Sequence, residues 1–435
     1  MADPREKEMG VLLRRLFPIH RSITGKGVRE TLRMLKKYIP LKVHEVGSGT
    51  KALDWRVPDE WNIKDAYIKD PSGKKVIDFK QNNLHVLNYS IPIRAKMPLA
   101  ELSEHIHTLP AQPGLIPYKT SYYKRNWGFC MTERQRKKLV AGTYEVVIDS
   151  SLEKGSLTYG ELVIAGRTKE EILFSTYVCH PSMANDNVSG PVLLSMLARH
   201  LLKLKRKKLR YTYRFIFIPE TIGSIVWLSR NRPVLGRIAG GLVATCVGDK
   251  GPLTYKRSRR GATLIDRAVE NAFARPGKKS KIKYRVMDFD PAAGSDERQF
   301  CSPGFDLPVG SLMRTPYGRY PEYHTSGDDL SVVRPKYLRE TLDRYIDTVA
   351  ELEDDEYYES RSPFGEPQLG RRGLYSAIGP AKNEGVRESA MLTVLNYSDG
   401  AHNLSWIARH SGLPLKELRA IARILVLHRL IRRVA

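Results

Sequence analysis

Between residues 143 and 358 the sequence alternates short β-prone runs with helical segments, and this alternation constrains the fold more than any other feature. Buried parallel strands read as short apolar runs, whereas helices between them carry apolar side chains at three- and four-residue spacing. The pattern therefore predicts an α/β domain with a doubly wound, mostly parallel sheet, covered by helices on both faces. The expected elements are a hairpin of strands 144–148 and 156–164, strand 172–178, helix 189–205, strand 213–219, helix 222–229, strand 242–248, helix 263–274, strands 284–289 and 309–313, and helix 335–358.

Three other stretches break this pattern and predict the domain organisation. Residues 1–44 hold two short helices without a core of their own, so we expect them to join residues 137–358 in one α/β domain. Residues 45–136 carry β-prone runs between Pro, Gly and Asn breakers, which indicates an inserted β-rich domain. Residues 375–435 hold three short helices, a tight second turn and a β-prone end, the pattern of a winged helix-turn-helix domain.

The four cysteines limit both the chemistry and the location that we expect. Four cysteines in 435 residues are too few for a disulfide scaffold, and none lies in a CxxC pair, which excludes a thiolate zinc knuckle. A reducing cytoplasm is the location that we expect. No apolar run approaches the roughly 20 residues of a membrane helix, and the charged N-terminus lacks the apolar segment of a secretory signal. Cys179 and His180 are neighbours at a strand end, so their side chains should lie on opposite faces, which argues against a thiol protease.

Five residues that can bind a metal or carry a proton follow the predicted strands. They are His180 and Asp186 after strand 172–178, Glu220 and Asp249 after the next two, and His324 in the loop after the last strand. The carboxyl ends of strands form one edge of a doubly wound sheet, and this set of nitrogen and oxygen ligands suits zinc. Each residue alone has a structural alternative as a helix cap, a dipole partner, a turn residue or a surface histidine. Five such residues at one edge favour a metal site.

The segments around these residues resemble those of zinc aminopeptidases with two co-catalytic metals. Residues 179–190, Cys-His-Pro-Ser-Met-Ala-Asn-Asp-Asn-Val-Ser-Gly, resemble their His and Asp-Asn-x-Ser-Gly motifs. Glu-Thr-Ile-Gly at 220–223 resembles Glu-Glu-x-Gly, and His324-Thr-x-x-Asp328 resembles the last ligand motif. Over nearly its whole length the chain is similar to a bacterial aminopeptidase-like family with a small inserted domain and a C-terminal winged helix.

This resemblance implies roles for the residues at the sheet edge. His180 and Asp249 would hold one zinc ion, and Asp186 would bridge to a second ion held with His324. Glu220 would be the general base that takes a proton from a zinc-activated water and returns it to the leaving amine.

Thr221 departs from the family pattern, which has a second Glu as a metal ligand at this place. A neutral hydroxyl is a poor substitute for a carboxylate, so the resemblance implies one or two zinc ions per chain. Asp296, Glu297 and Glu322 are acids that could complete the second site or bind the substrate amine.

The predicted function is zinc-dependent hydrolysis of an amide bond in a small peptide or aminoacyl amide. The alternative is a metal- or ligand-sensing regulator with a winged-helix domain and a degenerate hydrolase domain. The net charge of +25 favours anionic partners or a solubilising surface, and the basic stretch 255–260 could select an acidic substrate or be a solvated loop. The resemblance also brings an association with polysaccharide biosynthesis, and a homo-oligomer stays open.

The third helix of the C-terminal domain allows two roles. Lys416, Arg419 and Arg423 share one face of it, which would suit the DNA major groove. Protein contact with a solvated basic face is the favoured alternative, because the tail lacks a long basic wing.

Overall fold

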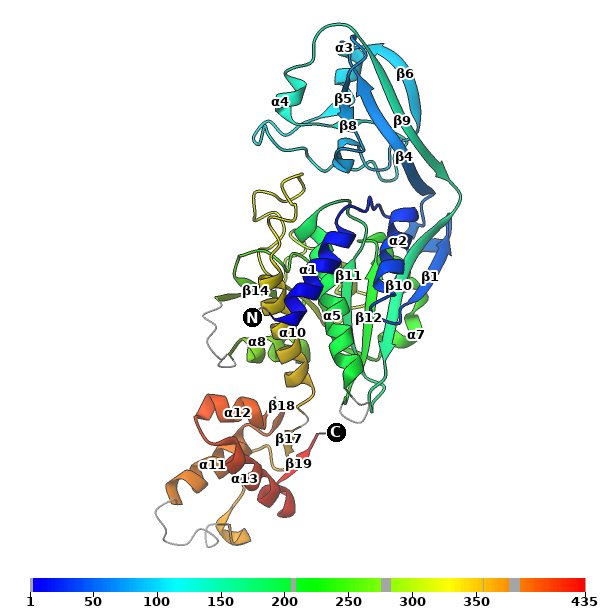
Figure 1. Ribbon diagram of the computed structural model, residues 1–435. Helices are drawn as coiled ribbons and strands as arrows, with labels where there is room; N and C mark the ends of the chain where they lie inside the picture. Colours follow the sequence, from blue (N-terminus) through cyan, green and yellow to red (C-terminus); the bar gives the residue numbers. More distant parts are fainter. Residues whose placement is uncertain (1–2, 205–208, 275–282, 355, 375–383, 435) are drawn as a thin grey trace. The chain divides into compact units, whose positions relative to one another are not determined.

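Two compact units make up the chain, residues 1–346 and residues 347–435 (Figure 1). In the computed structural model, the residues described are 3–204, 209–274, 283–354, 356–374 and 384–434. Within these ranges no helix is both long enough and apolar enough to cross a membrane.

An eight-stranded mixed sheet forms the centre of the first unit. Its strands, in spatial order, are β1 (Lys42–Gly47), β10 (Ser156–Ile164), β12 (Thr212–Ile218), β11 (Glu171–Tyr177), β13 (Ile238–Val243), β16 (Val309–Met313), β14 (Leu253–Lys256) and β15 (Tyr284–Met287). The four central strands, β12, β11, β13 and β16, are parallel. β11 is buried along its whole length, as expected for a strand covered on both faces.

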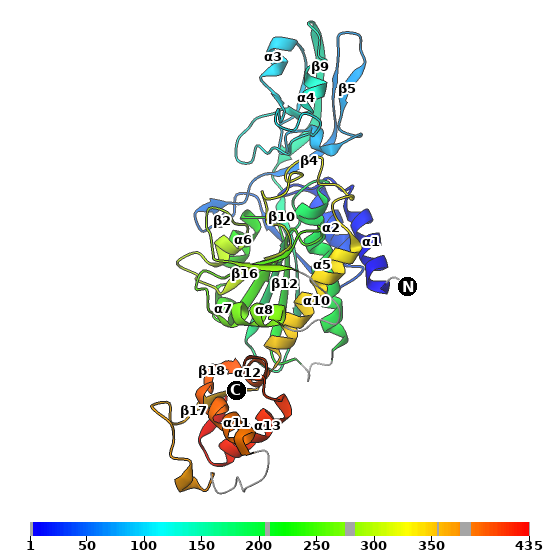
Figure 2. The same cartoon turned by 90° about the vertical axis from the view of Figure 1, so that its left-hand side faces the viewer.

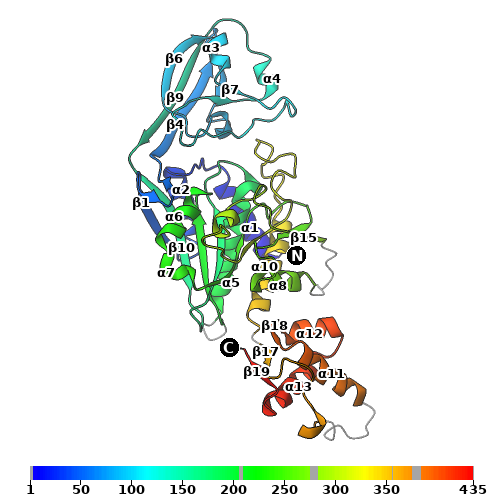
Figure 3. The same ribbon diagram turned by 180° about the vertical axis from the view of Figure 1, so that it is seen from behind.

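Helices cover both faces of this sheet, which confirms the doubly wound α/β architecture (Figure 2). The helix α1 (Pro4–Leu16) packs against α5 (Ser189–Lys203), and α2 (Lys26–Leu35) packs on β10. On the same side, Tyr345 of α10 (Pro335–Leu352) packs on Phe174, and α8 (Leu264–Ala274) contacts α10. The opposite face carries α6 (Ile222–Arg230), α7 (Arg232–Leu235) and α9 (Glu297–Phe300) (Figure 3).

A second, antiparallel sheet forms the inserted β-rich part. Its strands, in order, are β5 (Lys75–Asp78), β4 (Glu60–Lys69), β9 (Thr143–Glu153) and β6 (Ile93–Pro98). Shorter elements complete it, namely the pair β2 (Lys51–Ala52) and β3 (Trp55–Arg56), α3 (Leu99–Ser103), the pair β7 (Ile106–His107) and β8 (Phe129–Cys130), and α4 (Glu133–Arg136). β9 therefore pairs in the second sheet, although it lies beyond the sequence-based boundary at residue 137.

The predicted hairpin of strands 144–148 and 156–164 is wrong. β9 pairs with β4 and β6, whereas β10 pairs with β1 and β12, so the two consecutive strands belong to different sheets. The chain crosses from one sheet to the other at Lys154 and Gly155.

The second unit has the helices expected of a winged helix-turn-helix domain. They are α11 (Glu384–Asn396), α12 (Leu404–Ser411) and α13 (Leu415–Leu427), accompanied by the sheet β18 (Asp399–Asn403), β17 (Tyr357–Ser360) and β19 (Ile431–Arg433). The predicted helix 335–358 ends at Leu352, and its last residues form β17 instead. Leu369 and Leu374, upstream of the sequence-based boundary at 375, pack in the core of this unit.

Candidate metal centre

Asp186 lies in the kinked segment Ala184–Val188 that leads into α5, and a second acid holds this segment in place. The buried Asp328 accepts a hydrogen bond from the backbone N–H of Asn185 through Oδ1 (2.7 Å) and from that of Asp186 through Oδ2 (2.9 Å). Tyr320 donates its hydroxyl to the same Oδ2 (3.0 Å). The Asp of the His-Thr-x-x-Asp motif thus fixes the backbone that carries Asp186.

His180, Asp186 and His324 form the cluster that can hold a metal ion. Their ligand atoms all lie within 4.8 Å of one another. Oδ2 of Asp186 is 3.0 Å from Nε2 of His324 and 4.0 Å from Nε2 of His180. This oxygen is buried and has no hydrogen-bond partner among the described residues, whereas Tyr177 donates a short hydrogen bond to Oδ1. An orphaned carboxylate oxygen facing two imidazole nitrogens fits a divalent cation with nitrogen and oxygen ligands.

The protonation states of the cluster also suit a metal. Burial raises the pKa of Asp186, but His180 and His324 outweigh this effect and hold the pKa at about 2. Burial lowers the pKa of His180 to about 4, against the attraction of Asp186. At neutral pH the cluster therefore offers an ionised carboxylate and a neutral imidazole, the forms that bind a metal.

Glu220 lies beside this cluster, just after β12. Its Oε2 is 3.7 Å from Nε2 of His180, and its Oε1 accepts a 2.5 Å hydrogen bond from Ser295. Burial, together with the negative charges of Asp296 and Asp186, raises the pKa of Glu220 to about 8. A carboxyl group whose pKa lies this close to the pH of its surroundings can both take up and release a proton, as general acid–base catalysis requires.

Thr221 has a strained backbone with φ of +61°, which is rare for a β-branched residue. Its backbone N–H donates to Oδ1 of Asp296 (2.7 Å), which also accepts from Ser224 (3.0 Å). Oδ2 of Asp296 is buried and has no hydrogen-bond partner among the described residues. Asp296 thus anchors the turn that carries Glu220 and keeps one carboxylate oxygen uncommitted.

The structure does not bring Asp249 into the cluster. Its Oδ1 accepts hydrogen bonds from Gly251 (2.6 Å) and Thr315 (2.6 Å), and its Oδ2 accepts from Asn185 (3.0 Å). The strand predicted to end at Gly248 ends at Val243, so Asp249 is six residues beyond the strand. Its carboxylate holds neighbouring loops together.

The other acids and the basic stretch have local partners. Glu297 is paired with the buried Lys256 and accepts hydrogen bonds from Ser311 (3.0 Å) and Tyr317 (3.0 Å). Glu322 lies two residues before His324, and its carbonyl accepts from Thr325. The arginines of the basic stretch form ion pairs with neighbouring acids, namely Arg257 with Glu270 and Asp288, and Arg259 and Arg260 with Asp306.

The expectation that the Cys179 and His180 side chains lie apart is wrong. Sγ of Cys179 is 3.3 Å from Nδ1 of His180. β11 ends at Tyr177, so the alternation of a strand no longer applies to these two residues. Cys179 is buried, and burial raises the pKa of its thiol well above the ordinary value, which still disfavours a nucleophilic thiolate.

The inserted β-rich part supplies a wall of the centre that sequence reasoning missed. The Tyr118 ring lies 5.3 Å from the His180 ring and 5.2 Å from the His324 ring, and its backbone N–H donates to the carbonyl of His324 (2.8 Å). Ile116 and Ser326 form two further hydrogen bonds beside it. No local pattern in the sequence predicts this contact, because it depends on how the inserted part packs against the loop of His324.

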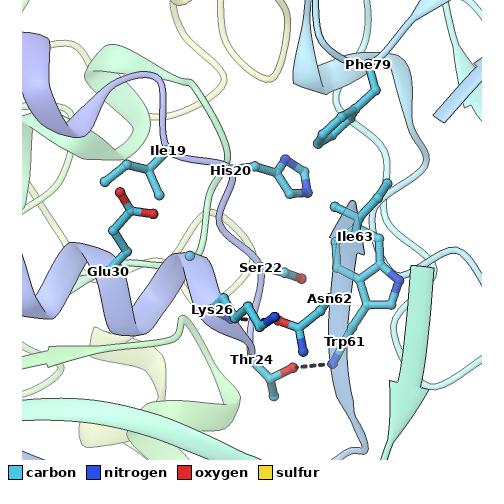
Figure 4. Close-up of a pocket in the computed structure, with 11 residues that line it drawn as sticks. Ile19, His20, Ser22, Thr24, Lys26, Glu30, Trp61, Asn62, Ile63 and Phe79 are labelled. Carbon is cyan, nitrogen blue, oxygen red and sulfur yellow. Dashed lines mark hydrogen bonds between the residues drawn. The ribbon is translucent and has the colours of Figure 1, made fainter. Parts of the chain in front are cut away.

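A separate pocket of about 210 Å³ lies between α2 and the first strands of the insert (Figure 4). His20 points into it, with its ring edge-on to Trp61 (5.5 Å) and Phe79 (5.0 Å). Both ring nitrogens of His20 are buried without a hydrogen-bond partner among the described residues, and burial lowers the pKa of His20 to about 3.

The structure has an aminopeptidase-like fold. The zinc aminopeptidase BSAP of Bacillus subtilis matches the structure with a TM-score of 0.58 at 13% identity, over 80% of this chain and 95% of that chain. A peptidase M28 precursor from Shewanella amazonensis matches with a TM-score of 0.53 at 12% identity, over 80% and 96%. At these identities the likeness establishes the fold.

The chain belongs to the family described as domain of unknown function DUF4910, which matches residues 11–355, and a winged helix-turn-helix family matches residues 356–433. A Clostridium acetobutylicum crystal structure, provisionally called a peptidase, has 50% identity and a TM-score of 0.84 over 99% of this chain and 96% of that chain. A protein of the same organism, provisionally named a polysaccharide biosynthesis protein with aminopeptidase-like domain, is 52% identical over 94% of this chain and 93% of its own length.

Proposed function

We propose that the chain is a zinc-dependent, aminopeptidase-like amide hydrolase that holds one metal ion through His180, Asp186 and His324. The observation that supports this most directly is Oδ2 of Asp186, which is buried without a hydrogen bond and faces two imidazole nitrogens. Two nitrogens and one carboxylate oxygen make the three-ligand set of catalytic zinc sites, in which a fourth position stays open. His180 is neutral and Asp186 ionised, as this set requires.

The second ion of the related enzymes has weaker support. Thr221 offers no carboxylate, and both oxygens of Asp249 are engaged in hydrogen bonds. Both oxygens of Glu297 are engaged as well. A single ion therefore agrees best with the available ligands.

A zinc ion in this set supplies Lewis acidity, because it lowers the pKa of a water molecule toward neutrality and polarises the substrate carbonyl. Glu220 acts as the general base: Oε2 is 3.7 Å from Nε2 of His180 and can reach a water beside that nitrogen. Ser295 holds the other oxygen of Glu220 (2.5 Å), which keeps the carboxylate oriented. The same carboxyl group returns the proton to the leaving nitrogen of the amide.

The substrate in this proposal is an amide with a free amino group nearby. Asp296 is suited to bind that amine, because its Oδ2 is uncommitted and its charge already influences Glu220. The name of the Clostridium acetobutylicum relative associates that protein with polysaccharide biosynthesis. Aminoacyl amides and amides of amino sugars are therefore the two substrate classes to compare.

Zinc analysis and kinetics of four proteins test the proposal. We expect the wild-type chain to bind about one zinc and to hydrolyse an aminoacyl amide. Glu220→Gln should keep the zinc and lose about 10²–10⁴-fold in kcat, the usual contribution of a general base. His324→Ala should lose the zinc, and the control Glu322→Gln, in the same loop, should change neither.

A full kcat for Glu220→Gln would refute the assignment of the base. A chain that binds one zinc but hydrolyses neither substrate class would support the regulator instead.

A further inference from the structure

The sulfur of Cys179 contacts both the ligand His180 and the base Glu220. Sγ is 3.3 Å from Nδ1 of His180, and the backbone N–H of Glu220 donates to Sγ at 3.2 Å. The side chain is 1% exposed, so water does not compete for these contacts. One atom thus connects two residues that lie 40 positions apart in the chain and that the proposed reaction needs together.

The chemistry of the imidazole fixes the direction of the first contact. Nε2 of His180 faces Oδ2 of Asp186 (4.0 Å) and Oε2 of Glu220 (3.7 Å), so Nε2 is the nitrogen available to a metal. A ligand nitrogen needs its lone pair, and a neutral imidazole has only one N–H group, which must then lie on Nδ1. Nδ1–H therefore donates to the sulfur, in the place where metal-binding histidines usually have a carboxylate, a carbonyl or water.

The backbone of His180 is held separately. The buried Arg21 donates from Nε to the carbonyl of His180 (2.8 Å) and from Nη1 to the carbonyl of Leu16 (2.6 Å). With the main chain fixed in this way and the ring packed against Tyr118 and Tyr177, the tautomer of the ring depends on the partner of Nδ1.

We propose that Cys179 is a positioning residue, whose sulfur accepts hydrogen bonds from Nδ1–H of His180 and the backbone N–H of Glu220 and so sets the tautomer of the ligand and the place of the base. The inference rests on the proposed zinc site.

The test compares Cys179→Ala, Cys179→Ser and the control Cys301→Ala in the full chain. Cys301 is also 1% exposed, and its sulfur also makes two hydrogen bonds, to the carbonyls of Leu307 (3.3 Å) and Val309 (3.1 Å). The control therefore removes the same atom from an equally buried place without touching His180 or Glu220. Zinc affinity is measured by competition with a chelating dye.

We expect Cys179→Ala to weaken zinc binding by about 10–100-fold, the usual effect of losing an outer-shell partner of a metal ligand. At saturating zinc its kcat should stay reduced, because the backbone N–H of Glu220 also loses its acceptor. Cys179→Ser should recover most of both losses, since a hydroxyl oxygen accepts the same two hydrogen bonds. Wild-type zinc affinity in Cys179→Ala, or equal losses in Cys301→Ala, would overturn the inference.

A measurement without metal separates this inference from the proposed function. In metal-free protein labelled with ¹⁵N-histidine, the His180 ring should carry its proton on Nδ1 in the wild type and shift toward the Nε2–H form in Cys179→Ala. A wild-type chain that binds no zinc would refute the proposed function alone. An unchanged His180 tautomer in Cys179→Ala would overturn the role of Cys179, whatever the zinc result.

Discussion

At the scale of single residues, Ser295 is the side chain that orients the proposed base. It donates to Oε1 of Glu220 at 2.5 Å and lies one position before Asp296. Asp296 in turn anchors the turn that follows Glu220, through the backbone N–H of Thr221. We expect Ser295→Ala to lower kcat by up to about tenfold with unchanged zinc content, because the carboxyl group of Glu220 loses a hydrogen bond of the kind that contributes about 0.5–1.5 kcal/mol. Steady-state kinetics and metal analysis measure the two effects.

The control for this prediction is Ser302→Ala, since Ser302 caps the neighbouring turn by donating to the carbonyl of Gln299. Loss of zinc in Ser295→Ala would contradict the interpretation, because Ser295 would then support the ligands rather than the base.

The burial of the His20 ring leads to a prediction about how the stability of the protein depends on pH. Its folded pKa is about 3, well below the ordinary 6.5, because burial disfavours the charged ring. The unfolded chain therefore takes up a proton below pH 6.5 that the folded chain refuses, so stability falls as the pH drops from 6.5 toward 3. From pH 6.5 to 5, His20 alone should remove roughly 1–2 kcal/mol of the free energy of unfolding.

Urea unfolding at the two pH values tests this effect. His20→Gln should lose less stability between pH 6.5 and 5 than the wild type, whereas the exposed His428 gives a control in His428→Gln. Equal losses in His20→Gln and the wild type would show that the His20 ring is not held neutral.

The sequence predicts the three residues of the cluster, but it misses Tyr118 and wrongly adds Asp249. His180, Asp186 and His324 sit at strand ends or in a recognisable motif, so local pattern and sheet topology suffice to bring them together. Tyr118 reaches the cluster from an inserted part whose placement no local pattern encodes. Asp249 was expected at a strand end because residues 244–248 are as apolar and buried as a strand, although they form a loop.

At the scale of elements, the segment 112–118 of the insert fixes the loop that carries His324. Its contacts are the hydrogen bonds of Tyr118 and Ile116 with His324 and Ser326, a bridge between Pro117 and Thr325, and a bond from Gln112 to the carbonyl of Pro321. His324 itself has φ of +53°, a conformation that needs support from its surroundings. The insert thus forms part of the candidate metal centre.

The Tyr118 ring gives the element-scale prediction. Tyr118→Ala should weaken zinc binding by about tenfold, because the two ligand rings lose the aromatic wall that packs against them, and aromatic pairs contribute about 0.5–1.5 kcal/mol beyond buried area. Tyr118→Phe should retain zinc affinity, since it keeps the ring. The exposed Tyr123 provides the control Tyr123→Ala. Full zinc affinity in Tyr118→Ala would show that the wall is dispensable.

The strand boundaries show where pattern reasoning fails for elements. β9 and β10 are consecutive β-prone runs joined by Lys154 and Gly155, and a local pattern cannot tell a hairpin from a crossing between two sheets. Similarly, β17 follows α10 after only a few residues, and the Tyr-rich start of this strand reads like the last turn of a helix. The long apolar runs of β11 and β12 left no such ambiguity.

At the scale of the whole molecule, the open question is whether the C-terminal unit binds DNA or protein. Of the three basic residues on α13, Arg419 is already bound to Glu356, with Nε 2.7 Å from Oε2. Lys416 and Arg423 are exposed. Because one guanidinium is engaged within the unit, we expect the full chain to show no salt-sensitive binding to duplex DNA.

A gel-shift titration over a range of salt concentrations checks this expectation. A steep salt dependence that falls by about one unit for each of Lys416→Ala and Arg423→Ala would instead establish phosphate contacts and contradict it.

The hydrogen bond between Tyr118 and the carbonyl of His324 couples ion binding at His324 to the packing of the insert on the same loop. If an ion bound at His324 stabilises that loop, the same ion also stabilises the packing of the insert against the loop. By thermodynamic reciprocity, a ligand that stabilises this packing must raise the affinity for the ion by an equal factor. Amide hydrogens of residues 112–118 would then exchange more slowly in the zinc-loaded chain. A large substrate that touches only the insert would in this way raise the occupancy of the centre from a distance.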